Sequence, residues 1–386
     1  MTVFLAGAFG QGNPGDEALL SAFARALGHL DPVASSCDPH GTEAAHGIAA
    51  VDRDDSRAVA RELRRADAVV VAGGTIFKTL HPASGRPPLS LLRRTAALAY
   101  TTRALRKPLA LVGVGAAPLH GRAAAALARA IVRASTLLVL RDEESAGHLA
   151  AAGAPTPMRV GADAAWTLVG APKAEPAATA VVMRGPAGGL APVTLDAGDD
   201  RPVVVALSHL AGGPELAERL AAGLAPVVGN GIPVRLDPWQ PDGDAELAAA
   251  VASRIDVEVA APPADLFSAG RDMEGARLVL AQRFHALVAA AGAGAPALAV
   301  AHEPKLEGLA RRLEQPAVAA DAPPAALTAA VLDAVDGTPA AATAVERERA
   351  AAEEAFRLLR VLLARGRSEE AVAVDGLALR PEEWLG

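Results

Sequence analysis

The sequence contains a single cysteine, Cys37, and aromatic residues make up only 3% of its 386 residues. One cysteine cannot form an internal disulfide, and no second thiol stands at zinc-site spacing. No uncharged run reaches the roughly 18 residues that a membrane-spanning helix needs, and the first residues, MTVFLAGAFG, lack the basic start of a secretory signal. We therefore expect a protein of a reducing compartment, the cytoplasm, with no transmembrane segment.

Basic residues are also not in excess. Lysine and arginine number 37 against 44 aspartates and glutamates, which gives a net charge of −7. Nucleic-acid binding needs a basic face, with aromatic side chains among the cations where single strands are bound, and no such cluster occurs. The composition therefore argues against a nucleic-acid partner. The histidines show no ligand spacing either, so we expect no metal site.

What the sequence does have is a repeated alternation of short apolar runs and helical stretches. At roughly 150 residues per domain, its length predicts two domains. A Pro/Ala/Gly stretch at 170–176 separates them, so we predict domains at 1–170 and 178–340 and a helical tail at 341–386. Alternating strands and helices are typical of parallel, doubly wound sheets. The fold class is therefore α/β, with two Rossmann-like domains facing a cleft and a C-terminal amphipathic helix. The predicted strands are Thr2–Ala6, Ala68–Ala72, Leu109–Val114, Thr136–Leu140, Ala180–Met183, Val203–Leu207, Val234–Leu236, Leu278–Leu280 and Ala297–Val300.

A glycine-rich segment follows the first predicted strand and leads into an apolar helix. Its residues Gly10, Gly12 and Gly15 match the pattern of dinucleotide-binding loops. Asp16 and Glu17 come next, at the helix N-terminus where a pyrophosphate would lie, and their charges would repel it. We therefore expect no nicotinamide cofactor. The carboxylates suit either sugar hydroxyls or a structural cap of the helix, and both interpretations stay open.

Two further strand ends carry candidate binding residues. One strand ends in Gly73 and Gly74, whose bare backbone lets a ligand approach closely, although a tight turn is the commoner explanation. Another ends at Arg141, a side chain able to bind a carboxylate or phosphate through paired hydrogen bonds. A salt bridge to the neighbouring Asp142 or Glu144 is the commoner role for such an arginine.

The strongest motif follows the predicted strand Leu278–Leu280. Arg283 and His285 lie there at a strand-to-helix turn, which suits anion binding together with proton transfer. The next strand repeats the arrangement with Glu303 and Lys305, which adds a second cation to the same sheet edge.

Three weaker candidates complete the set. Arg184 and Asp163 each follow a predicted strand end, where they either face the cleft or pair with each other. Trp239 offers a ring on which a sugar can stack, but a large aromatic at a strand end is more often packed in the core.

The order of these motifs from Val3 to about Leu313 resembles that of the polysaccharide pyruvyl transferases. Several motifs in the right order are more specific than any one of them. The segments that carry the resemblance are Asn13–Glu17, Gly73–Gly74, Arg141–Ser145, Arg283–His285 and Pro304–Lys305.

The resemblance implies a GT-B-like arrangement and a reaction in which phosphoenolpyruvate, a co-substrate and not a bound cofactor, puts a pyruvate ketal on a polysaccharide of the cell wall or surface. It implies a glycan acceptor, lipid-linked or free, and a location in the cytoplasm or at the inner membrane face. The implied catalytic residues are His285 as acid/base and Arg283, Lys305 and Arg141 as cations around the donor. The implied substrate-binding residues are Asn13, Gly15, Asp16, Glu17, Gly73, Gly74, Arg184 and Glu303.

Two other functions stay open at this point. A nucleotide-sugar glycosyltransferase of the same build would use Arg283 and Lys305 to hold a diphosphate. A glycan-binding protein with a degenerate site would bind without turnover.

Overall fold

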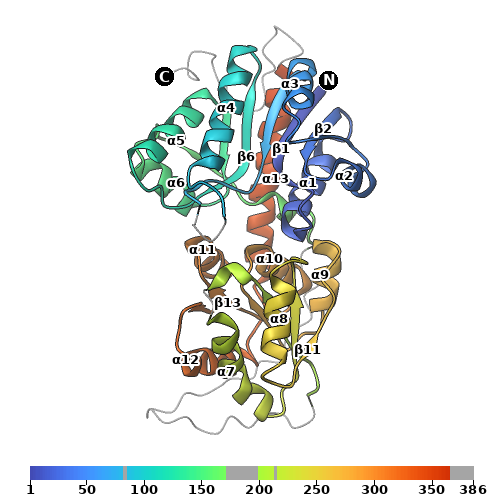
Figure 1. The fold of residues 1–386 in the computed structure, drawn as a ribbon, viewed down its shortest axis with the longest axis vertical. Helices are drawn as coiled ribbons and strands as arrows, with labels where there is room; N and C mark the ends of the chain where they lie inside the picture. The colour runs from blue at the N-terminus through green and yellow to red at the C-terminus, as the bar shows by residue number, and fades with distance from the viewer. Residues whose placement is uncertain (81–84, 171–198, 213–214, 366–386) are drawn as a thin grey trace. The chain divides into compact units, whose positions relative to one another are not determined.

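The computed structural model describes residues 1–80, 85–170, 199–212 and 215–365, which form two compact units (Figure 1). The first unit holds Met1–Leu168 and the C-terminal segment from Glu348, and the second holds Val169–Arg347. The predicted domain bounds of 1–170, 178–340 and 341–386 stay predictions. The predicted strand Ala180–Met183 and the candidate Arg184 lie outside the described residues.

The first unit is built on an eight-stranded sheet in which the paired strands are parallel. Its order is β3-β2-β1-β4-β6-β7-β8, with β5 pairing on β6. The chain reverses direction across the sheet between β1 and β4, the topological switch point of a doubly wound fold. The strands are β1 (Thr2–Phe9), β2 (Asp31–Ser36), β3 (Ala49–Asp52), β4 (Ala68–Ala72), β5 (Thr75–Phe77), β6 (Leu109–Ala116), β7 (Leu137–Leu140) and β8 (Arg159–Val160).

Helices cover both faces of this sheet. Because of this, β4 and β6 are buried along their whole length, which explains their uninterrupted apolar sequences. Helices α3 to α6 contribute to the core on one face. The helices are α1 (Pro14–Leu27), α2 (Pro39–His46), α3 (Ser56–Arg65), α4 (Ser90–Ala104), α5 (Arg122–Ala134) and α6 (Glu143–Ala151), with a short 3₁₀ helix, η2 (Ala164–Thr167).

The second unit repeats the design with a six-stranded parallel sheet of order β11-β10-β9-β12-β13-β14. Its switch point lies between β9 and β12. The strands are β9 (Val203–Leu207), β10 (Val234–Pro238), β11 (Glu258–Val259), β12 (Leu278–Ala281), β13 (Ala297–Ala301) and β14 (Ala317–Ala319). The predicted doubly wound α/β fold is therefore confirmed in both units.

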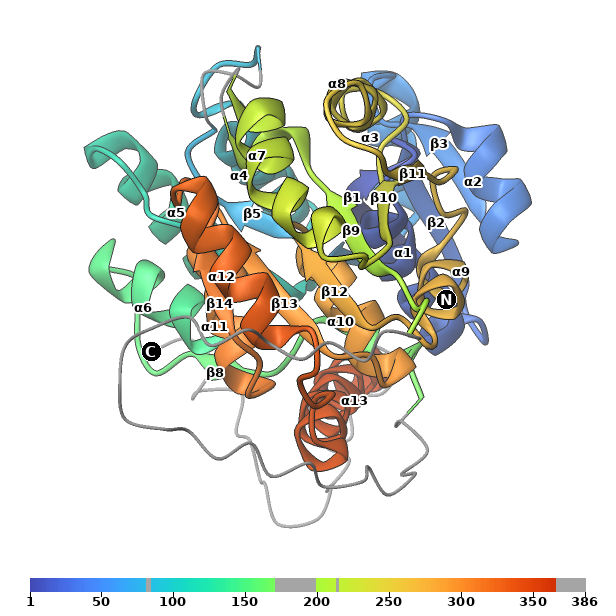
Figure 2. The same cartoon turned by 90° about the horizontal axis from the view of Figure 1, so that it is seen from below.

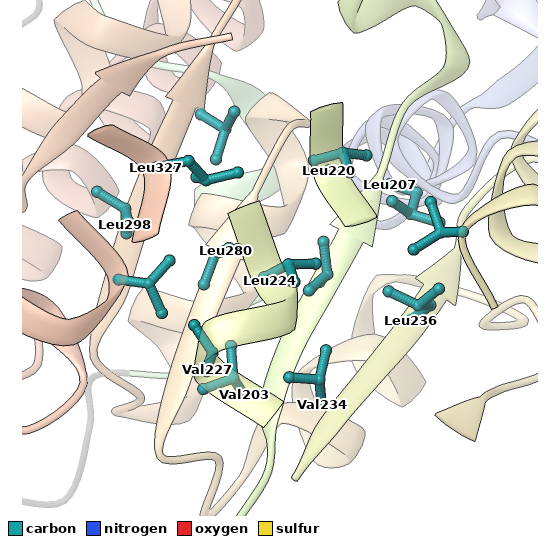
Figure 3. Packing of buried hydrophobic residues seen from close by; sticks show 14 of the residues in the cluster. Val203, Leu207, Leu220, Leu224, Val227, Val234, Leu236, Leu280, Leu298 and Leu327 are labelled. Atoms are coloured by element: carbon teal, nitrogen blue, oxygen red, sulfur yellow. The ribbon is translucent and has the colours of Figure 1, made fainter. Parts of the chain in front are cut away.

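In this unit α7 packs beside α8 and α12, while α10 packs beside α9 and α11 (Figure 2). The core between α7 and the strands is made of aliphatic side chains, among them Leu220 and Leu224 of α7 above Val203 and Leu280 (Figure 3). The helices are α7 (Leu216–Gly229), α8 (Asp244–Ala252), α9 (Leu266–Met273), α10 (Phe284–Ala293), α11 (Pro304–Arg312) and α12 (Pro324–Ala334), with a 3₁₀ helix, η3 (His209–Ala211).

The predicted C-terminal helix is present as α13 (Ala342–Arg365). Phe356 of this helix meets Phe23 of α1 edge to face, with ring centroids 4.8 Å apart. Both rings belong to the first unit, and both are buried. The apolar face of α13 from Glu348 onward is therefore part of the core of the first unit.

Candidate functional site

The glycine-rich loop of the first unit is held together by its own polar side chains. Asn13 caps α1: its Oδ1 accepts the amide of Gly15 at 3.1 Å, and its Nδ2 donates to Asp16 Oδ2 at 2.7 Å. Pro14 follows at the first helical position, where a missing N–H costs nothing. The sequence Asn-Pro-Gly-Asp thus starts the helix and places Asp16 at its positive end.

The carboxylate of Glu17 closes the same loop. Its Oε1 accepts the backbone amide of Gly10 at 2.8 Å, and its Oε2 lies 2.9 Å from His46 Nε2. Gly10 has a φ of +74°, and a Cβ there would lie 2.2 Å from Ser36 Oγ, so only glycine fits. Asn13, Gly15, Asp16 and Glu17 are thus brought together at the carboxyl end of β1, with structural hydrogen bonds on the two carboxylates.

The glycine pair at the end of β4 lies beside this loop in the strand order. Gly73 and Gly74 have φ values of +69° and +74°, and nothing lies within 4 Å of a Cβ built on Gly74. The carbonyl of Gly74 accepts the amide of Gly115 at 2.8 Å, which ties the turn to β6. As predicted, the backbone at this strand end carries no side chains, and at Gly74 there is open space beside it.

Arg141 follows β7 and is buried, with 3% of its side chain exposed. Its Nε donates to Asp142 at 2.9 Å, and its NH1 lies 3.8 Å from Asp163 Oδ2. Asp142 also caps α6 by accepting the amide of Ser145 at 2.8 Å. Burial raises the pKa of Asp142, but the Arg141 charge and the hydrogen bonds from Ser145 and Arg141 lower it by more. The predicted contact between Arg141 and a donor stays a prediction.

The second unit gathers its polar residues around a fully buried carboxylate, Asp244, at the start of α8. Its Oδ2 accepts the amides of Trp239 and Gln240 at 3.2 and 2.9 Å and pairs with Arg283. Its Oδ1 accepts the amide of His209 at 2.8 Å and lies 2.7 Å from His209 Nδ1. This carboxylate therefore joins the carboxyl ends of β9, β10 and β12.

These contacts also fix the charge of Asp244. Burial raises its pKa, but the Arg283 charge and the hydrogen bonds from His209 and Gln240 outweigh that effect, and the net direction is downward. The group is therefore ionised at neutral pH.

Arg283 bridges three strand ends from its place before α10. Its Nε donates to the carbonyl of Leu207 at 2.7 Å, and its NH2 donates to Gln240 Oε1 at 3.0 Å as well as to Asp244. The guanidinium is 12% exposed. It is thus held rigidly by one anionic and two neutral acceptors.

His285 lies in the first turn of α10, and its ring meets Phe284 edge to face with centroids 5.4 Å apart. On the neighbouring turn, Lys305 pairs with Glu303 at the start of α11. Because β12 and β13 are adjacent and parallel, both turns lie at one sheet edge. The structure therefore brings together Arg283, His285, Glu303 and Lys305 as the motif spacing predicted.

Three residues of this edge were missed by the sequence analysis: His209, Gln240 and Asp244. A signal for one of them existed, because His209 comes just after the predicted strand Val203–Leu207. Trp239, considered as a sugar platform, is 1% exposed and belongs to the core. Asp163, considered as facing the cleft or pairing with Arg184, lies 3.8 Å from Arg141 NH1, and its pairing with Arg184 stays a prediction because Arg184 is outside the described residues.

Among the described residues, no group of three or more His, Cys, Asp or Glu side chains is arranged to hold a metal ion. Within the same ranges, no helix is both long enough and apolar enough to cross a membrane.

Comparison with protein families gives one match, a model of polysaccharide pyruvyl transferases that covers residues 13–304. It spans the motif segments of both units from Asn13 to Pro304 and ends one residue before Lys305. A search of curated proteins finds no match.

Solved structures of nucleotide-sugar enzymes share the fold. A putative UDP-N-acetylglucosamine 2-epimerase from Listeria monocytogenes superposes with a TM-score of 0.59 at 12% identity, over 96% of this chain and 98% of the other. The S. aureus MnaA–UDP complex gives 0.63 at 11% identity, over 94% and 96%. Anabaena HepE with UDP-glucose gives 0.58 at 13% identity, over 94% and 100%. At such identities the likeness shows the fold, which is the GT-B-like class expected from the sequence.

Proposed function

Because the chain belongs to the polysaccharide pyruvyl transferase family, we propose that it transfers a pyruvyl group from phosphoenolpyruvate to two hydroxyls of a sugar, forming a cyclic ketal and releasing phosphate. Two observations together carry this proposal. The family model matches the chain, and Arg283, His285 and Lys305 lie at one edge of the second sheet.

The electrostatics of that edge suit an anionic donor. Phosphoenolpyruvate carries a carboxylate and a phosphate, so its pocket needs fixed cations and backbone donors. Arg283 is held in place before α10, and Lys305 lies in the first turn of α11. The N-termini of both helices add positive potential at the same edge. In this proposal the donor competes with Glu303 for Lys305.

His285 supplies the proton transfer in this scheme. One hydroxyl adds to C2 of the donor while the methylene carbon C3 gains a proton and becomes a methyl group. Phosphate then leaves from C2, and the second hydroxyl takes its place. An imidazole at the edge of the donor site is a group suited to deliver the proton to C3.

The acceptor side of the proposal uses the first unit. Asp16, Glu17 and the open backbone at Gly74 supply acceptors and space for sugar hydroxyls. The acceptor is a glycan, either free or lipid-linked at the inner face of the membrane. The proposed donor is an intracellular metabolite, so the proposed reaction takes place in the cytoplasm.

A second candidate function is nucleotide-sugar chemistry. It is favoured by the solved structures of this fold that were determined with UDP or UDP-glucose. In that case the cations at the ends of β12 and β13 would hold a diphosphate.

Thermal unfolding with phosphoenolpyruvate, UDP and NAD in parallel separates these functions. A ligand at 100 times its dissociation constant stabilises the native state by about 2.7 kcal/mol. We expect stabilisation by phosphoenolpyruvate alone, unchanged in EDTA because arginine, lysine and helix N-termini supply the positive charge. Stabilisation by UDP without phosphoenolpyruvate would favour the second function, and binding that required magnesium would contradict the metal-free site.

Turnover is then measured as phosphate release from phosphoenolpyruvate with glycosides that carry neighbouring free hydroxyls. Mass spectrometry of the product should show the added pyruvate ketal. Binding of phosphoenolpyruvate without release for any acceptor would point to a glycan-binding protein with a degenerate site.

A further inference from the structure

His209 occupies the place in the second unit where doubly wound folds bind ligands. It follows β9, and β9 and β12 are the neighbouring strands at which the chain reverses direction across the sheet. Ligands of open α/β sheets bind beyond the carboxyl ends of the strands at this switch point. Arg283, at the end of β12, donates to the carbonyl of Leu207 at 2.7 Å, only two residues before His209. His209 and the proposed donor cation therefore belong to one site.

The ring of His209 is oriented by two contacts. Asp244 Oδ1 lies 2.7 Å from Nδ1, and an ionised carboxylate can only accept, so Nδ1 carries the proton and donates it. The ring also packs on Gly243, where a Cβ would lie 2.7 Å from Cγ. A larger residue at 243 would displace the imidazole. The buried carboxylate thus fixes the tautomer that leaves the lone pair on Nε2.

The imidazole is nevertheless open to a substrate, because 36% of the side chain is exposed, whereas Asp244 is fully buried. The neighbouring Leu210 is 57% exposed and gives the same edge an apolar surface against which a sugar ring can lie. The charged groups that face this imidazole are Asp244, on α8, and Arg283, which shares that carboxylate.

The reaction of the proposed function has to move two protons. Two sugar hydroxyls each lose a proton while two new bonds form between their oxygens and C2 of the donor. One proton ends on C3, whose electron pair comes from the former double bond. The other leaves with the phosphate when the bond from C2 to the phosphate oxygen breaks. His285 accounts for the proton at C3, and a second group is needed at the hydroxyl.

We propose that His209 is a second catalytic acid/base, which takes the proton of an acceptor hydroxyl at Nε2 and returns it to the departing phosphate, with Asp244 as the positioning residue. This inference rests on the proposed function. It assigns the acceptor hydroxyl to the switch point of the second sheet, beside the donor.

His209→Asn is the sharpest test, because the asparagine amide can keep the hydrogen bond to Asp244 but has no Nε2. His209→Gln and His209→Ala accompany it, and His29→Asn, at an exposed position in the first unit, is the matched control. Asp244→Asn is less informative, because it also removes the anchor of Arg283. Each variant is assayed for phosphate release and for thermal stabilisation by phosphoenolpyruvate.

We expect all three His209 variants to lose roughly a hundredfold to ten-thousandfold in kcat, the usual range for a positioned proton-transfer group. Stabilisation by phosphoenolpyruvate should persist, and His29→Asn should behave as the wild type. Normal turnover in His209→Asn would overturn the inference and leave the proposed function standing. A raised KM with unchanged kcat would also overturn it, because His209 would then only bind substrate. A wild-type protein that neither binds nor consumes phosphoenolpyruvate would overturn both.

Discussion

Arg141 and Arg283 follow the ends of strands in equivalent doubly wound sheets, but their surroundings differ. Arg141 faces two carboxylates, Asp142 at 2.9 Å and Asp163 at 3.8 Å. Arg283 faces one carboxylate, Asp244, and two neutral oxygens, so its cluster sums to zero from one cation and one anion. The exposed fractions are 3% and 12%. The same residue at the same kind of position is thus almost fully buried in one unit and partly exposed in the other.

This difference indicates which unit suits the anionic donor of the proposed function. The first edge has the carboxylates of Asp16 and Glu17 at the end of β1 and those of Asp142 and Asp163 around Arg141 after β7, and carboxylates repel an anion. The second edge has Arg283 paired with the single carboxylate of Asp244, Lys305 paired with Glu303, and two helix N-termini. The second unit therefore suits the donor of the proposed function better than the first.

Replacing His285 should have the largest effect. His285→Gln should lower kcat by roughly a hundredfold to ten-thousandfold, because a positioned proton donor is lost, while phosphoenolpyruvate binding persists. Steady-state kinetics and thermal shift measure the two quantities. Near-normal turnover, or a loss of stability without a separate loss of kcat, would make His285 a structural histidine of the α10 turn.

Arg141→Met tests the structural side of the comparison. Removing the cation leaves Asp142 and Asp163 buried without their partner, so we expect the free energy of unfolding to fall by about 3–5 kcal/mol. Urea denaturation measures it. If instead the variant kept its stability and lost donor binding, Arg141 would be a donor ligand and the contrast with Arg283 would fail.

Lys305→Ala should act on donor affinity. A charge-assisted hydrogen bond to the donor is lost in the ground state and in the transition state alike, so KM for phosphoenolpyruvate should rise about ten- to hundredfold with little change in kcat. Glu303→Gln is the matched control and should lower KM, because the competing anion is gone. A fall in kcat with unchanged KM for Lys305→Ala would contradict this assignment.

Acid should weaken the first unit through Asp142. Its pKa is lowered in the folded protein, so its contribution to stability is present above the unfolded pKa of about 3.9 and is lost as the pH falls through the folded value. Asp142→Asn should therefore lose less unfolding free energy than the wild type between pH 7 and pH 2, as measured by urea denaturation at each pH. An equal loss in both proteins would show that other carboxylates dominate the acid sensitivity.

Asp16→Asn should have the smallest effect on the donor. Removing a negative charge cannot weaken the attraction for an anion, so phosphoenolpyruvate binding should stay the same or become slightly tighter. Use of the acceptor should become weaker. Glu17→Gln should behave likewise, since an amide oxygen can still accept the Gly10 amide. Loss of donor binding in a folded variant would place the donor at the first edge.

Much of the fold followed from local patterns. The predicted runs Ala68–Ala72 and Val203–Leu207 coincide with β4 and β9, because central strands buried on both faces have continuous apolar sequences. Strands β2 and β3 were not predicted. They lie at one side of the first sheet, and their sequences, DPVASS and AAVD, have few large apolar residues. Their pairing with β1 and with each other makes them strands.

The sequence by itself determined the two doubly wound units, the C-terminal helix and the clustering of Arg283, His285, Glu303 and Lys305. Each depends on short-range spacing, because residues that directly follow neighbouring parallel strands must meet at one sheet edge. The tertiary structure decided the surroundings of these residues. Asp244 lies 35 positions from His209 and 39 from Arg283, and only the folding of β9, β10 and β12 into one sheet brings the three side chains together. Charge compensation and burial depend on such distant partners, and so they are properties of the folded chain.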